Sequence, residues 1–290
     1  MADLRQYGNH PLLRPVLYLV LLLFVLFYLL PLYVMLANAF KPLEEIRAGG
    51  LLALPRDWSL EPWFTAWSGA RIGVEATGLK PFFLNSAIMV IAAVAISTLL
   101  GALNGYVLSK WRFRGASLIF GLMVFACFIP FQIVLIPMAR ILGMMGLAGT
   151  VSGLVLVHVI YGISFTTLFF RNYYSSFPDD LVRAAMIDGA GFFTLFRRIL
   201  LPNSGPVIVV TVIWQFTNIW NDFLFGASFS DADSQPLTVA LNNLVNSSTG
   251  VKEYNVHFAS AILAAFPTLL VYILAGRYFV RGLLSGAVKG

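Results

Sequence analysis

Few polar side chains interrupt the long apolar stretches of this sequence, and they are the residues whose chemistry could matter there. The candidates among them are Gln132, His158, Asn218, Asn221 and Asp222. A polar or ionisable group is costly to hold inside a membrane, so its usual role is to contact a solute or to bond another helix. We therefore predict these five residues as candidates for lining a substrate pathway.

Some of these candidates also have a plainer interpretation. His158 lies midway along its apolar stretch, where a hydrogen bond between helices is favoured over a proton relay. Asp222 would anchor the outer end of a helix at the membrane surface. Gln132 lies between Pro130 and Pro137, so it could line a pathway at a helix irregularity.

The sequence lacks the residue patterns of several kinds of site. Within its apolar stretches it has no paired Asp, no His-x-x-x-His pattern and no Ser/His couple. It has no Gly-Lys pair, so no phosphate-binding loop of the Walker A type is present. Cys127 is the single cysteine, which excludes an intramolecular disulfide and a Cys-based metal site. We predict no catalytic residue, no metal site and no cofactor in this chain.

The composition is that of an all-α polytopic membrane protein. Hydrophobic residues make up 59% of the 290 residues and charged residues 11%, whereas soluble proteins have roughly 25% charged residues. Six intervals without Asp, Glu, Lys or Arg each reach the ~20 residues that a helix needs to cross the hydrocarbon core. The predicted spans are 15–39, 84–109, 116–139, 150–171, 204–226 and 258–280.

The positions of Lys and Arg predict the orientation of these spans. Lysine and arginine gather in the short connections on the cytoplasmic side of a membrane. With six spans, the basic segments all fall on that side, which places both termini inside. The predicted cytoplasmic segments are the N-terminus 1–14, the turn 110–114, the loop 172–202 and the tail 281–290, and the predicted outer loops are 40–83 and 227–257.

The loop 172–202 has the pattern of a helix–turn–helix between spans four and five. Pro178 followed by Asp179 and Asp180 is typical of a helix start, because carboxylates favour the positive end of the helix dipole. Gly189-Ala190-Gly191 would end that helix, and a second amphipathic helix would follow before Pro202 enters the fifth span. Lying flat on the lipid surface is the alternative role for such a hairpin.

The same loop resembles the "EAA–DGA" cytoplasmic loop of ABC importer permeases. The resemblance is carried by Arg183-Ala184-Ala185-Met186-Ile187-Asp188-Gly189-Ala190 and then by Phe196, Ile199, Leu201 and Pro202. In that family the loop supplies a coupling helix that sits in a cleft of the ATP-hydrolysing subunit. The resemblance assigns ATPase coupling to Arg183, Ala184, Ala185, Asp188, Gly189, Ala190, Gly191, Phe196 and Pro202, and to Val288 and Lys289 in the tail.

Further residues resemble the carbohydrate-uptake group of these permeases, and in particular the smaller, six-span permease of maltose-type transporters. They are Asn85-Ser86, Tyr106, Trp220-Asn221-Asp222-Phe223, Arg277-Tyr278-Phe279-Val280-Arg281-Gly282 and the final residues 286–290. The resemblance implies that residues 15–290 form an ABC-transporter transmembrane domain in a bacterial inner membrane. It implies an imported sugar, a hexose or small glycoside, that is held mainly by the other permease subunit.

The resemblance also implies a set of partners. These are a second homologous permease, a dimer of ABC ATPases that holds ATP and Mg, and an extracytoplasmic sugar-binding protein whose cleft receives part of the loop 227–257. Membrane lipid would surround the chain, and no nucleic acid is expected. The alternatives are an ion-coupled secondary transporter and an intramembrane enzyme. Both are disfavoured, because no acidic residue lies centrally in a span and no catalytic couple is visible.

One residue departs from the family pattern. The family usually has Glu before the pair of alanines, where it can form an ion pair with an arginine of the ATPase, and this chain has Arg183. The usual ion pair therefore cannot form. Either the ATPase carries a compensating acid, or Asp179 and Asp180 replace the glutamate, or packing alone holds the interface.

Overall fold

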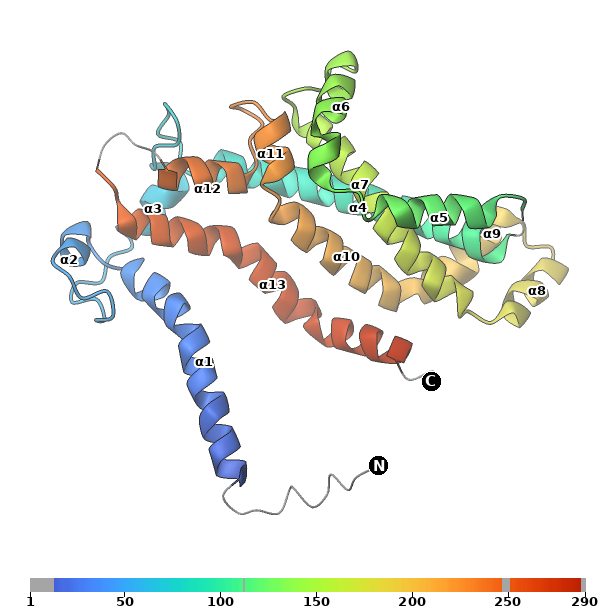
Figure 1. Ribbon diagram of the computed structural model, residues 1–290, viewed down its shortest axis with the longest axis horizontal. Coiled ribbons are helices and arrows are strands. Elements are labelled where there is room, and N and C mark those ends of the chain that lie inside the picture. The colour runs from blue at the N-terminus through green and yellow to red at the C-terminus, as the bar shows by residue number, and fades with distance from the viewer. Residues whose placement is uncertain (1–12, 112, 247–250, 288–290) are drawn as a thin grey trace. The chain divides into compact units, whose positions relative to one another are not determined.

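The computed structural model describes residues 13–111, 113–246 and 251–287, with side chains given up to residue 276. These residues form helices and no strands, apart from two isolated bridges. The helices are α1 Leu13–Asn38, α2 Leu43–Arg47, α3 Glu61–Ser68, α4 Lys80–Lys110, α5 Ala116–Ala126, α6 Phe131–Met144, α7 Val151–Ser175, α8 Asp179–Ile187, α9 Phe192–Leu195, α10 Gly205–Trp220, α11 Leu224–Phe229, α12 Leu237–Asn246 and α13 Tyr254–Ala287 (Figure 1).

The chain divides into two compact units, which are described separately. The first comprises residues 1–79 and 244–263, and the second comprises 80–243 and 264–290. In the first unit, α1 is apolar along its length and exposed over most of it, as expected of a helix whose surroundings are lipid or another chain. After α1, the ammonium of the buried Lys41 donates to the Asn38 side chain at 3.1 Å and to the Gly50 carbonyl at 3.0 Å, which orders the loop that follows.

The second unit is built around the close pairing of α4 and α7. Two glycines of α4 allow the backbones to approach, because a Cβ on Gly101 would overlap Thr166 and a Cβ on Gly105 would overlap Phe170 and the backbone beside it. Small residues commonly permit such close helix contacts in membranes. The Thr166 hydroxyl also donates to the Ser97 carbonyl at 2.9 Å, which fixes the register of the pair.

The helices α4 and α7 run parallel. Near the start of α4, the Asn85 amide donates to the carbonyls of Asp233 and Gln235, and Gly149 before α7 pairs with Ser230 of the same segment. At their other ends, Lys110 of α4 donates to the Phe177 carbonyl just after α7. The chain must therefore return across the membrane between Lys110 and Val151.

Five helical stretches are long and apolar enough to span a membrane, and the pair α5–α6 provides a sixth crossing if it counts as one span. Because α4 and α7 are parallel, that pair must make one crossing. The described helices therefore give six spans, the even number that the charge pattern requires. This part of the chain is an all-helical polytopic membrane protein.

The third span, predicted over 116–139 with an irregularity between Pro130 and Pro137, is not one continuous helix. It is broken between Ala126 and Phe131, and α5 and α6 meet at 103°. Pro130 lies at the start of α6 and accounts for the break, because proline has no N–H to donate and its ring clashes with a helical backbone four residues earlier. The second proline, Pro137, lies within α6 without ending it.

The fifth span also differs from the predicted range 204–226. A π-helical turn at Phe196–Leu200 and a 3₁₀ turn at Leu201–Ser204 connect α9 to α10 without a gap, so Pro202 lies inside a helical path. The span ends at Trp220. Two residues later, the Asp222 carboxylate accepts from the amides of Phe225 and Gly226, each at 3.1 Å, which stabilises the start of α11.

Candidate functional site

The segment from Phe177 to Ser204 forms a helical hairpin, α8 followed by α9, at the end of α4 and α7 opposite α11 (Figure 1). Asp179 and Asp180 occupy the first turn of α8. Gly189 ends the helix with φ +83°, and the Ala190 amide donates back to the Ala185 carbonyl at 2.9 Å. Glycine adopts this left-handed conformation without steric cost, which explains the turn between the helices.

The inner face of the hairpin is part of the core of the second unit. Val182 of α8 and Leu195, Phe196 and Leu200 after the turn are buried. They pack with a cluster from the ends of α4, α7 and α10, whose buried members include Ala102, Tyr106, Phe170, Tyr174 and Val207. This packing fastens the hairpin to three membrane helices rather than leaving it loose on the lipid.

Polar bonds connect the hairpin to α4. The Lys110 ammonium donates to the Phe177 carbonyl at 2.7 Å and forms an ion pair with Asp179 at 2.6 Å. The hydroxyl of Tyr106 donates to the Phe192 carbonyl at 3.3 Å.

Other polar bonds connect α7 to the turn before α10. The Tyr173 hydroxyl donates to the Asn203 carbonyl at 2.6 Å, and the hydroxyls of Tyr174 and Ser204 are 2.8 Å apart. Movement of the hairpin would therefore move the ends of α4, α7 and α10.

The outer face of α8 is exposed and partly apolar. Leu181, Met186 and Ile187 have exposed fractions of 54%, 42% and 86%, and Phe193 after the turn is 75% exposed. Exposed large apolar side chains gathered on one element are typical of a surface that another protein covers.

The predicted coupling residues divide between the two faces of the hairpin. Arg183, Ala184, Asp188, Gly189, Gly191 and Pro202 are exposed, and Ala185 and Ala190 are half-buried. Phe196 is buried in the core of the second unit, so it does not lie on the exposed face of the hairpin. Val288 and Lys289 lie outside the described residues.

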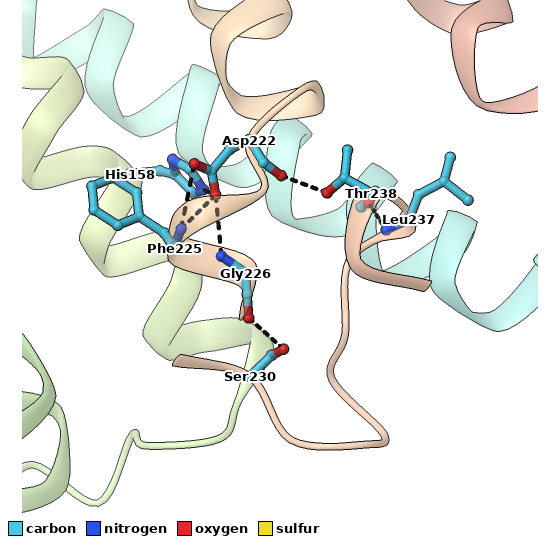
Figure 2. A network of polar contacts seen from close by, with 8 residues as sticks. His158, Asp222, Phe225, Gly226, Ser230, Leu237 and Thr238 are labelled. Atoms are coloured by element: carbon cyan, nitrogen blue, oxygen red, sulfur yellow. Dashed lines mark hydrogen bonds and ion pairs between the residues drawn. The ribbon is translucent and has the colours of Figure 1, made fainter. Parts of the chain in front are cut away.

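A second cluster of polar groups lies at the opposite end of α7, around Asp222 (Figure 2). Besides capping α11, Asp222 accepts at its backbone carbonyl from the Thr238 hydroxyl. The neighbouring Leu237 amide donates to the Ser86 hydroxyl at 2.8 Å. These bonds connect the segments on either side of residues 230–236 to the start of α4.

The Asp222 carboxylate and His158 face each other across a gap. His158 Nε2 lies 3.8 Å from Asp222 Oδ2, beyond hydrogen-bond distance. The Asp222 carboxyl lies beyond the end of its span, and its pKa is raised above the ordinary value because the group is buried. Hydrogen bonds from the amides of Gly226, Phe225 and Leu224 offset part of this rise in pKa. The expected helix-to-helix hydrogen bond is not formed at Nε2, which has no hydrogen-bond partner among the described residues.

The structure brings three of the five predicted pathway residues together. His158, Asn218 and Asp222 line one pocket of about 190 Å³. Gln132 is exposed near the start of α6, and Asn221 is exposed at the end of α10, where its amide donates to the Thr217 carbonyl; neither lines the pocket.

Sequence reasoning missed Gln215, which also lines this pocket and donates to the Ser97 hydroxyl at 2.8 Å. Its position in a charge-free interval was the available signal. A Cβ on Gly162 of α7 would overlap its amide, so a residue without a side chain at 162 makes room for Gln215.

Comparison with known proteins gives a consistent result. Residues 93–284 match the model of a family described as "Binding-protein-dependent transport system inner membrane component". The chain is 44% identical to a probable ABC transporter permease protein of Pyrococcus horikoshii over 64% of this chain and 68% of that protein. It is 33% identical to the xylose/arabinose import permease protein of Haloferax volcanii over 93% of this chain and 92% of that protein.

A solved structure shares the fold. The chain is similar, with a TM-score of 0.79 and 19% identity, to a chain in the crystal structure of a bacterial ABC transporter involved in the import of the acidic polysaccharide alginate. The match covers 96% of this chain and 98% of that one.

Proposed function

Because the chain belongs to the family of binding-protein-dependent transport system inner membrane components, it is a permease subunit of an ABC importer, and we propose that its cargo is a hexose or small glycoside. Two observations support a sugar. A relative named for xylose/arabinose import is similar along nearly the whole chain. The motif residues Asn85-Ser86 and Trp220-Asn221-Asp222-Phe223 resemble the carbohydrate-uptake group.

The hairpin is the observation that carries the coupling role. Its inner face packs against the ends of α4, α7 and α10. Its outer face exposes Leu181, Met186 and Ile187, which a partner could contact. We infer that an ATPase dimer, which holds ATP and Mg, grips this outer face. Closure of that dimer would then move the ends of three spans together.

Two further partners complete the proposal. The loop 227–257 would contact an extracytoplasmic sugar-binding protein, and it begins from a base fixed to α4, because Asn85 holds the carbonyls of Asp233 and Gln235 at 2.8 and 3.1 Å. A second homologous permease would cover part of the exposed apolar surface. This chain performs no catalysis in the proposal, since the energy comes from ATP hydrolysis by its partner.

The experiment that tests this proposal is reconstitution with matched variants. The chain is purified with the products of its neighbouring genes, and ATP hydrolysis in proteoliposomes is measured with the binding protein and a panel of sugars. Ile187→Glu should abolish ATPase copurification. Val74→Glu is the control, since Val74 is equally exposed, at 87% against 86%, but lies outside the hairpin.

The two outcomes separate clearly. Loss of the ATPase with Ile187→Glu and its retention with Val74→Glu support the docking face. Equal behaviour of the two variants, or full transport by the chain in the absence of any ATPase, would refute it. The second result would favour the secondary transporter instead.

A further inference from the structure

The pocket around His158 has the lining of a ligand site. Its walls come from α6, α7, α10, α11 and the turn between the last two, and include His158, Tyr161, Phe165, Trp214, Asn218 and Asp222. Aromatic rings surround it on several sides, including Trp214, whose ring lies 4.5 Å from that of Phe165. Mostly apolar walls with a few convergent polar groups are typical of small-molecule sites.

Two polar atoms at this pocket lack partners. His158 Nε2 and Tyr161 Oη are buried and make no hydrogen bond within the described residues. The His158 side chain is 94% buried, since its exposed fraction is 6%. A buried donor or acceptor without a partner is destabilising, so such groups in a pocket are expected to bond a ligand.

The gap between His158 and Asp222 suits a hydroxyl group. At 3.8 Å the imidazole and the carboxylate do not bond each other. A hydroxyl placed against both could donate to the carboxylate and accept from the imidazole N–H, because a hydroxyl has one donor and two acceptor positions. In this arrangement the hydroxyl of Tyr161, a lining residue whose Oη has no partner among the described residues, would provide a further bond to the ligand.

The charge and size of the pocket narrow the ligand further. No Lys or Arg is among the described residues that line it, and Asp222 is acidic, so an anionic ligand is disfavoured. Drug-sized ligands occupy pockets of ~300–1,000 Å³. At about 190 Å³, this pocket has room for a single ring. Flat aromatic faces suit the C–H face of such a ring.

We propose that this pocket is a subsite of this subunit for one neutral sugar ring, with hydroxyls bonded by His158, Tyr161 and Asp222 and the ring packed on Trp214. The proposal rests on the proposed sugar-import function. It goes further, because the family resemblance places the sugar mainly in the other permease subunit.

The single native cysteine permits a direct test. In a Cys127→Ser background, Asn218→Cys places a thiol at the pocket and Asn221→Cys places one three residues away, outside it. The pair is well matched, because both asparagines are exposed and each donates to the carbonyl four residues earlier. The rate of maleimide modification is measured in the full complex without the binding protein, with sugar added directly.

The sugars separate the chemical classes. D-glucose, D-xylose, L-arabinose and maltose are the neutral rings, D-glucuronate adds a carboxylate to the ring, and D-sorbitol has hydroxyls without a ring. A neutral ring should slow modification at residue 218 at least fivefold and leave residue 221 unchanged. D-glucuronate and D-sorbitol should not protect.

A second variant tests the hydrogen bond itself. His158→Gln, added to the residue 218 reporter, should raise the sugar concentration for half protection roughly threefold to tenfold, the factor that corresponds to one lost hydrogen bond. Tyr161→Phe should do the same while conserving the ring. No change in either variant would show that these groups do not bond the sugar.

The remaining outcomes distinguish failure of the subsite from failure of the proposed cargo. Protection by D-glucuronate equal to that by D-glucose would overturn the neutral-ring assignment. Transport of a sugar that gives no protection would overturn the subsite alone. A complex in which no sugar stimulates ATP hydrolysis or protects the thiol would overturn both the subsite and the proposed cargo.

Discussion

Lys110 should contribute more to holding the hairpin than its partner Asp179 does, although the two form one ion pair. The Lys110 side chain is 5% exposed and also donates to the Phe177 carbonyl at 2.7 Å, whereas the Asp179 side chain is 64% exposed. Hydrogen bonds from charged groups contribute about 1.5–3 kcal/mol. Exposed ion pairs contribute about 0–1 kcal/mol because solvent screens them.

Lys110→Met retains the unbranched stem and removes the charge. It should weaken the attachment of the hairpin by about 2–3 kcal/mol, which corresponds to a roughly 30- to 150-fold larger population of the detached state. Asp179→Asn should cost less than about 1 kcal/mol, including the loss of its charge at the helix start.

The assay is hydrogen exchange of the backbone amides in residues 178–190, measured in lipid nanodiscs beside sugar-stimulated ATP hydrolysis. Lys110→Met should speed exchange across the segment and reduce the ratio of sugar uptake to ATP hydrolysed. Exchange in Asp179→Asn as fast as in Lys110→Met would refute the reasoning, since it would make the exposed pair, rather than the buried bond, the main attachment.

Three other predictions concern the exposed face of α8, the contact between α4 and α7, and the outer loop 227–257. Arg183→Glu restores the family's usual charge and should weaken coupling to this chain's own ATPase; unchanged sugar-stimulated hydrolysis would count against this. Gly105→Ala should lower the free energy of unfolding by about 1–3 kcal/mol, because its Cβ overlaps Phe170. Gly121→Ala, with no atom within 4 Å of its Cβ, should instead raise it by up to about 1 kcal/mol, because alanine favours the helix more than glycine does, as measured by thermal unfolding in detergent. Asn85→Ala removes its hydrogen bonds to the carbonyls of Asp233 and Gln235 and should weaken the attachment of that segment to α4 by about 1–2 kcal/mol. The backbone amides of residues 231–236 should then exchange faster; unchanged exchange would show that other contacts hold the segment.

Much of the hairpin could be predicted from its sequence, because its boundaries depend on local chemistry. Pro178, the two aspartates and Gly189 act through backbone conformation and the helix dipole, which short-range patterns report. The helical continuity through Pro202 was not predictable in the same way. It depends on the burial of Leu200 and Ser204 against the ends of other helices, which no local pattern shows.

The candidate site shows where reasoning from residue type ends. Phe196 belongs to the coupling motif by its spacing, yet it is buried. The motif alone does not show which of its members face the partner. His158 lies about sixty residues before Asn218 and Asp222 in the sequence, and it meets them only because α7 packs beside α10 and α11. Hydropathy likewise found the third span but not its break, since an apolar count carries no information about the missing N–H of Pro130. The two prolines on either side of Gln132 were the sequence signal for an irregularity there.

The close contact of α4 and α7 at Gly101 and Gly105 has a mechanical consequence. From Tyr174 at the hairpin to His158 at the pocket, α7 is a rod of roughly 24 Å, so a tilt of about 10° displaces one end by roughly 4 Å relative to the other. A stiff rod of this kind acts as a lever. A change in the width of the pocket would then also change the position of the hairpin. Weakening the contact between α4 and α7 would uncouple the pocket from the hairpin without changing the residues at either place.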